Sequence, residues 1–125
     1  MTKMSALAGV AHNIAHHSAG GLSYISPHLA MALRAKGEST TEIELLDPEP
    51  YPGNAEEMQP LRLALLALKT TVEAILRKHG FAREDVTSIV LQVTPAPWDT
   101  EGFVLHARSI ITGKNGRTYD SGWLQ

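Results

Sequence analysis

The amino-acid sequence predicts an α/β protein of the α+β type, built as a two-layer sandwich. We expect a mixed sheet of about four strands with a C-terminal β-hairpin, and two or three helices on one face. Segments with helical hydrophobic periodicity and segments in which hydrophobic and polar residues alternate follow one another, and one helical segment lies between two alternating ones. The length of 125 residues suits a single domain over residues 1–125.

The N-terminal third predicts two helices. Hydrophobic residues recur at helical spacing over residues 3–18, and the pair Gly20–Gly21 is expected to end this helix. For the second helix, Ser26 is a good N-cap, Pro27 fits the first helical position, and Gly37 follows the last turn. One narrow stripe of the first helix consists of Met4, Leu7, Ala11 and Ile14.

Residues 40–48 predict a half-buried strand. Thr41, Ile43 and Leu45 fall on one face of an extended chain, and glutamates occupy the positions between them. Pro48 ends the strand, and the proline-rich residues after it are expected to form a loop.

A long helix that begins near Pro60 and ends at Gly80 connects this strand to the next, over residues 86–94. In the second strand, every second residue from Ile89 to Val93 is expected to face inward. A helix between two strands indicates a right-handed crossover that joins parallel neighbours. The carboxyl ends of both strands would then lie at the same edge of the sheet.

The last part of the chain predicts the hairpin. Residues 103–112 and 117–124 flank the sequence Gly-Lys-Asn-Gly, which suits a tight turn with Gly116 at positive φ. Four strands leave two sheet edges, which a protein of this size often resolves by pairing with a neighbouring subunit.

Charge is unevenly distributed along the chain. Lys3 is the only Asp, Glu, Lys or Arg before Arg34, and every acidic residue lies at Glu38 or beyond. A surface helix usually carries a charged face, so residues 4–33 are expected to be covered. We expect another copy of the chain to cover them in a homo-oligomer, a dimer or trimer, with Met4, Leu7, Ala11 and Ile14 in the interface.

The composition excludes several classes of partner. A net charge of -2 and a pI near 6.3 provide no basic surface for nucleic acid or for an anionic membrane. Without such a surface, we expect core or interface anchors, rather than platforms for bases, at Trp98, Trp123 and Tyr119. The chain has no cysteine and no apolar stretch of membrane-spanning length, which favours a cytoplasmic protein.

Four of the six histidines lie in residues 12–28. His12 and His16 are four residues apart, so both imidazoles would project from one helical face, a spacing that helical metal sites use. A divalent metal would need further ligands from His17, His28 or another subunit. The favoured interpretation is interfacial or solvent-facing histidines, with a metal site and acid/base chemistry as alternatives, and no cofactor is predicted.

A catalytic alternative involves His28 and Asp99. His28 would lie in the first turn of the second helix, where the positive end of the dipole disfavours imidazolium and favours proton exchange near neutral pH. In this alternative, either His28 or a carboxylate such as Asp99 would assist His12 and His16 at a subunit boundary.

A small-molecule site is expected at the shared strand edge. The two loops there would contribute Asp47 and Tyr51 from one side and Trp98 and Asp99 from the other. His106 and Arg108 share one face of the third strand, where an exposed row would bind an anionic ligand.

The run from Val72 through Gly80 and Asp85 to Val93 resembles the helix and strand segment of the reactive-intermediate deaminase family of small trimeric α/β proteins. It covers about a fifth of the chain. The residues after Val93 depart from that family, and no arginine matches its substrate-binding position, so the resemblance implies only the local fold.

The sequence therefore predicts a cytoplasmic domain with a binding or structural role that self-associates through its N-terminal helical segment. The alternative is a small enzyme that uses its histidine cluster at a subunit interface.

Overall fold

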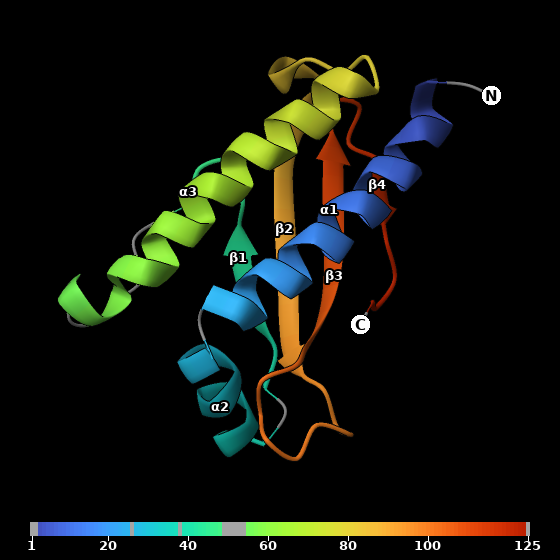
Figure 1. Cartoon of the computed structure of the whole chain (residues 1–125). Helices are drawn as coiled ribbons and strands as arrows, with labels where there is room; N and C mark the ends of the chain where they lie inside the picture. The colour runs from blue at the N-terminus through green and yellow to red at the C-terminus, as the bar shows by residue number, and fades with distance from the viewer. Residues whose placement is uncertain (1–2, 26, 38, 49–54, 125) are drawn as a thin grey trace.

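The computed structural model describes residues 3–25, 27–37, 39–48 and 55–124, and it confirms an α+β architecture of helices layered on a sheet (Figure 1). The elements in chain order are α1 (Lys3–Ile25), α2 (Pro27–Ala35), β1 (Thr41–Glu44), α3 (Ala55–Lys78), a 3₁₀ turn η1 (Arg83–Asp85), β2 (Val86–Pro95), β3 (Leu105–Gly113) and β4 (Thr118–Asp120).

The four strands form one sheet in the order β1-β2-β3-β4, and every neighbouring pair is antiparallel. The expectation of a mixed sheet with parallel β1 and β2 is wrong, because Thr41 pairs with Val93 and Glu44 with Val90. α3 runs in the same general direction as β1 (Figure 1). The helix therefore delivers the chain to the end where β1 finished, and β2 runs back beside it.

The helices cover one face of the sheet. α1 crosses β3 and packs against α3, while α2 lies against β2 (Figure 1). The alternation predicted from the sequence is confirmed, since Ile43, Ile89, Leu91 and Val93 are all buried on this side. In the described ranges, no helix is long and apolar enough to cross a membrane.

α1 extends beyond its predicted end at Gly20–Gly21. Leu22 is fully buried in the core, and the backbone of Gly21 lies close to α3, where an added Cβ would be 4.0 Å from Leu68 Cδ2. Packing of the last turns therefore outweighs the cost of about 1 kcal/mol per glycine in a helix.

Other boundaries follow the local signals. α2 begins at Pro27 and ends before Gly37, whose φ is 76° and whose N–H donates to Arg34 O. Gly116 has the expected positive φ in the turn between β3 and β4. α3 begins at Ala55 rather than near Pro60, since the intervening residues are mostly good helix formers. Ser26 lies outside the described residues.

Candidate functional site

In the part of the chain that the structure describes, no helix covers the second face of the sheet, which carries half-buried polar residues. Along β3, residues alternate strictly between fully buried and half-buried positions. The strand register places the half-buried residues of neighbouring strands beside one another, Gln92 with Arg108 and Thr94 with His106. We call this surface the open face.

A hollow of about 470 Å³ lies on the open face where β2 ends and β3 begins. An isolated bridge between Ala107 and Leu124 brings the C-terminal segment alongside β3, so residues distant in sequence meet here. The volume of the hollow falls within the range of about 300–1,000 Å³ typical of ligand sites. The lining residues are Thr40, Thr94, Pro95, Pro97, His106 and Trp123.

The imidazole of His106 is the central polar group of this hollow. The ring of Trp98 stands against it edge to face, with centroids 4.6 Å apart and an interplanar angle of 88°. Nδ1 of His106 is buried, and it has no hydrogen-bond partner among the described residues. Such a group costs about 1–3 kcal/mol relative to a satisfied one, so a ligand that reached it would recover free energy.

The loop that carries Trp98 is held by its own backbone and by α2. The carboxylate of Asp99 accepts hydrogen bonds from the backbone N–H groups of Glu101 and Val104. The bond from Val104 is the largest cause of the lowered pKa of Asp99. Arg34 of α2 donates to Ala96 O at the start of the loop. Asp99, predicted as a catalytic carboxylate, thus organises the loop beneath Trp98.

Arg108 lies beside the hollow, and its charge is compensated. Its Nε is 2.9 Å from Asp120 Oδ2, although the N–H is not aligned with the carboxylate, so the contact is electrostatic rather than a directed hydrogen bond. Its guanidinium carbon lies 5.7 Å from the ring centroid of Trp123. In the same row, Gln92 donates to Glu42 at 2.8 Å. Arg108 therefore offers no uncompensated positive charge for the predicted binding of an anionic ligand.

The other predicted ligand residue, Asp47, lies at the opposite end of the sheet. Because β1 and β2 are antiparallel, Asp47 meets the start of β2, whereas Trp98 follows its end, and ten residues of strand span about 33 Å. The shared strand edge predicted from the sequence is therefore wrong. Tyr51 lies outside the described residues.

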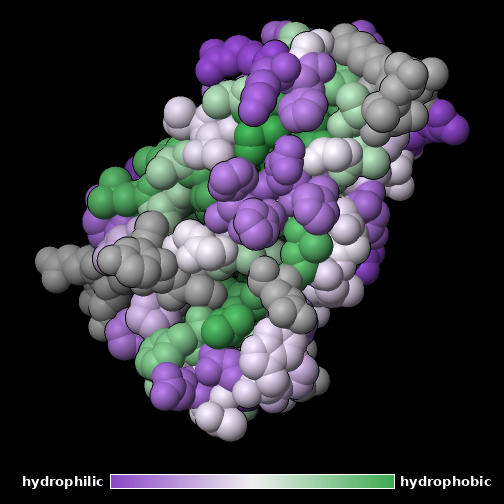
Figure 2. Space-filling view, turned by 45° about the vertical axis from the view of Figure 1, so that its right-hand side comes forward, coloured by the Kyte–Doolittle hydropathy of each residue, from purple (hydrophilic) through white to green (hydrophobic). Residues whose placement is uncertain are grey.

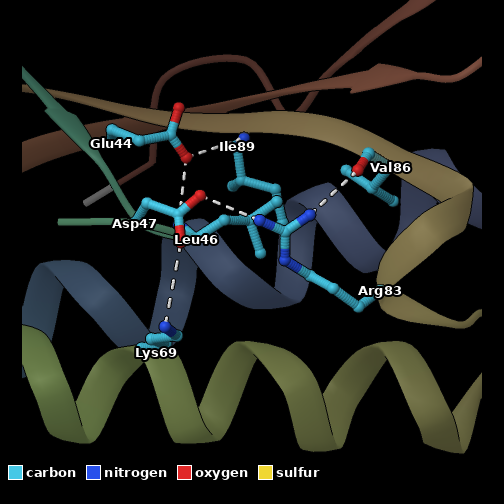
Figure 3. Close-up of polar contacts among 7 residues, drawn as sticks. All are labelled: Glu44, Leu46, Asp47, Lys69, Arg83, Val86 and Ile89. Carbon is cyan, nitrogen blue, oxygen red and sulfur yellow. Dashed lines mark hydrogen bonds and ion pairs between the residues drawn. The ribbon is translucent and has the colours of Figure 1, made fainter.

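Figure 3 shows what Asp47 does instead. Its carboxylate contacts Arg83 at 2.9 Å and Lys69 of α3 at 3.9 Å, which ties three segments together. Arg83 also donates to Val86 O. Since 73% of the Asp47 side chain is exposed, these ion pairs add little to stability, and Asp47 is a surface linking residue.

The histidines of α1 form an exposed row on its outward side. His12, His16 and His17 are exposed, and the rings of His16 and His17 are 6.0 Å apart. Over the described ranges, no group of three or more His, Asp or Glu is placed to hold a metal ion. A site at His12 and His16 remains a prediction that requires ligands from elsewhere. His28 is exposed on α2.

The stripe predicted as a subunit interface is already covered by the chain itself. Leu7, Ala11 and Ile14 are 5%, 0% and 1% exposed and belong to the hydrophobic core under α1. The side chain of Met4 lies outside the described residues. This part of the charge-poor segment thus needs no second subunit to bury it.

A second hollow of about 220 Å³ lies between α1 and the β3–β4 turn, and it is smaller than most ligand sites. Two of its charged groups, Lys114 and Asp85, contact each other at 3.6 Å. The hollow on the open face is the better candidate.

Sequence reasoning singled out Trp98, His106 and Arg108 for ligand binding, and the structure brings these three together. It missed Trp123, which was expected to be an anchor and is 43% exposed, and it missed Thr94. The polar positions of β2 were a signal for an uncovered face. Comparison of the chain with protein-family models, curated proteins and solved structures gave no significant match.

Proposed function

We propose that this protein is a ligand-binding domain whose site is the hollow on the open face. The observation that carries the proposal is a hollow of about 470 Å³ lined by His106 and the exposed ring of Trp123, with the exposed ring of Trp98 against His106. The buried Nδ1 of His106 has no hydrogen-bond partner among the described residues. Ligand sites combine apolar and aromatic lining with a few placed polar groups, which is the composition found here.

Binding fits this site better than catalysis. The described lining residues include no carboxylate, and the nearest acidic group on the loop, Asp99, accepts two backbone hydrogen bonds from its own loop. An acid/base mechanism would need a second titratable group within hydrogen-bond reach of the same reacting atom. A binding role needs only the shape and the polar groups of the hollow.

A fragment screen followed by two-dimensional NMR tests the proposal. We expect the strongest shifts at Thr94, at His106 and at the indole N–H groups of Trp98 and Trp123. His106→Leu should remove them, whereas Phe103→Ala, an exposed aromatic on the same loop but outside the lining, should not. If bound fragments shift only residues remote from the hollow, the assignment of this site is wrong.

A second function, self-association, is supported by the outward side of α1. Where the structure describes the side chains of α1, over residues 6–22, the exposed residues include no Asp, Glu, Lys or Arg: they are Ala8, Gly9, His12, Asn13, His16, His17 and Gly20. On α3, Leu63 and Leu66 are 55% and 47% exposed. On the side of the molecule drawn in Figure 2, hydrophobic patches border a central hydrophilic group. Two identical copies of such a face would meet without like-charge repulsion.

Sedimentation analysis separates this interface from the one predicted on the buried stripe. Ala8→Glu places a charge on the outward side of α1 and should dissociate an oligomer while leaving the fold intact. Thr118→Glu, on the open face of the edge strand β4, is the matched control. Leu7→Glu would unfold the monomer and is not informative. A monomer at micromolar concentration would refute self-association.

Residence in the cytoplasm is part of the proposal. It is supported by the absence of cysteine, which suits a reducing compartment. The net charge of -2 supports a small ligand or a second copy, rather than nucleic acid or an anionic membrane, as the partner.

A further inference from the structure

The ligand class can be narrowed from the charges and polar groups of the hollow. We propose that the hollow binds a neutral oligosaccharide, whose ring faces stack on Trp98 and Trp123 and whose hydroxyl groups bond to His106 and the neighbouring threonines. This inference rests on the proposed ligand-binding function of the same site.

The first argument concerns charge. Among the residues that the structure describes, none in the lining is Asp, Glu, Lys or Arg. The nearby cation Arg108 is held by Asp120 and packs on Trp123, and the row it belongs to ends in Glu42 on the other side. Taking a charged ligand out of water without an opposite charge to meet it is costly, so the ligand is neutral.

The second argument concerns the exposed aromatic rings. Trp98 is 50% exposed and Trp123 is 43% exposed, although indole rings are highly buried on average. An indole offers a large apolar face and one N–H donor. The C–H face of a sugar ring covers such a surface while its hydroxyl groups stay at the polar rim.

The third argument concerns donors and acceptors. Whichever tautomer His106 adopts, one ring nitrogen is a donor and the other an acceptor. Thr40 and Thr94 add hydroxyl groups to the lining. Sugar hydroxyls both donate and accept, so a saccharide matches every group of this set. A proline-rich peptide would also stack on aromatic rings, but its proline residues lack N–H donors for the acceptor nitrogen.

The fourth argument concerns length. The lining runs from Thr40, just before β1, to Trp123. The bridge between Ala107 and Leu124, the residue after Trp123, places this segment beside β3. The positions of β1, β2, β3 and the C-terminal segment are separated by three interstrand spacings, about 14 Å in all. This span favours an oligosaccharide over a single sugar.

Intrinsic fluorescence tests the inference directly, because the chain has two tryptophans and both border the hollow. The full chain is titrated with maltotriose, cellotriose and chitotriose, and with benzoate and a proline decapeptide for comparison. We expect saturable emission changes with at least one trisaccharide. Trp98→Ala and Trp123→Ala should each weaken binding at least about tenfold, the loss expected for an aromatic hot spot. Phe103→Ala, with its melting temperature checked beside the others, should bind like wild type.

The outcomes separate the inference from the function on which it rests. If benzoate or the proline peptide saturates the change and no trisaccharide does, the ligand class is wrong while the binding site stands. If none of the five probes binds, the saccharide inference is overturned, and the fragment screen then decides the proposed function independently.

Discussion

The two faces of β3 are made from alternate residues of one strand, yet they differ in every physical respect. On the covered face, Leu105, Ala107 and Ile111 are at most 1% exposed. On the open face, His106 and Arg108 are half-buried and interact with aromatic rings and carboxylates. The comparison teaches that the covered face holds the fold together, whereas the open face carries half-buried polar side chains and is where we propose the ligand site.

Neighbouring isoleucines provide the strongest test of this difference. Ile111 is fully buried under the helices, and Ile110 is half-buried on the open face. Ile111→Ala should lower the free energy of unfolding by about 2–5 kcal/mol, because it removes buried methyl groups and leaves a cavity. Ile110→Ala should cost less than about 1 kcal/mol. Urea unfolding measures both, and equal losses would mean that the open face is part of the core.

A pair of glutamates on the open face of β1 gives a second, smaller contrast. Glu44 Oε1 accepts from the backbone N–H groups of Leu46 and Ile89, at 2.9 and 3.2 Å (Figure 3). Glu44→Ala should therefore destabilise by about 1–3 kcal/mol, since two part-buried donors lose their acceptor. The exposed carboxylate of Glu42 accepts a hydrogen bond from the side chain of Gln92, and Glu42→Ala should cost less than about 0.5 kcal/mol. If Glu44→Ala is as stable as Glu42→Ala, the hydrogen bonds of Glu44 do not stabilise the fold.

Ser109 is an exception on the covered face and predicts a change of opposite sign. Its side chain is 0% exposed, and its hydroxyl has no hydrogen-bond partner within the part of the chain that the structure describes. Ser109→Ala removes a desolvated polar group and should raise the free energy of unfolding by about 1 kcal/mol. The thermal midpoint should rise accordingly. A fall would reveal a partner for this hydroxyl in the folded protein.

The contrast between the faces also shows which features of the fold can be predicted from the sequence. Alternation along residues 86–94 predicted which side chains are buried, and Pro27, Gly37 and Gly116 marked helix and turn boundaries, because these signals are local. The direction of β2 was not predictable in this way. The direction of β2 depends on whether α3 runs in the same direction as β1 or in the opposite one. The pattern of a strand, a helix and a second strand in the sequence is compatible with both directions.

The site illustrates the same limit. His106 and Arg108 were recognisable from their chemistry and their shared face of one strand. Trp98 was chosen as part of a loop at the carboxyl ends of two parallel strands, and that topology is wrong. Trp123 joins them only through the bridge between Ala107 and Leu124, a contact that no periodicity reports. Asp47 was misplaced because its partner loop was inferred from the wrong strand direction.

The smallest expected effect concerns the loop that sets Trp98 against His106. Hydrogen bonding, chiefly from the Val104 N–H, lowers the pKa of Asp99 below its usual 3.8. A carboxyl group with a lowered pKa in the folded state binds its proton more readily in the unfolded chain. Its stabilising contribution is therefore complete above pH 3.8 and is lost as the pH falls through the folded-state pKa.

Asp99→Asn tests this contribution and its link to the open face. The amide keeps one acceptor oxygen but places an NH2 group opposite one of the two backbone N–H donors, so the variant removes the charge and one hydrogen bond. We expect slightly lower stability than wild type at pH 7, with the difference shrinking as the pH drops below 3.8. Tryptophan emission should change in parallel if the loop holds Trp98 in place. A stability difference that stays constant from pH 7 to about pH 2 would contradict a charge effect and assign the role of Asp99 to shape alone.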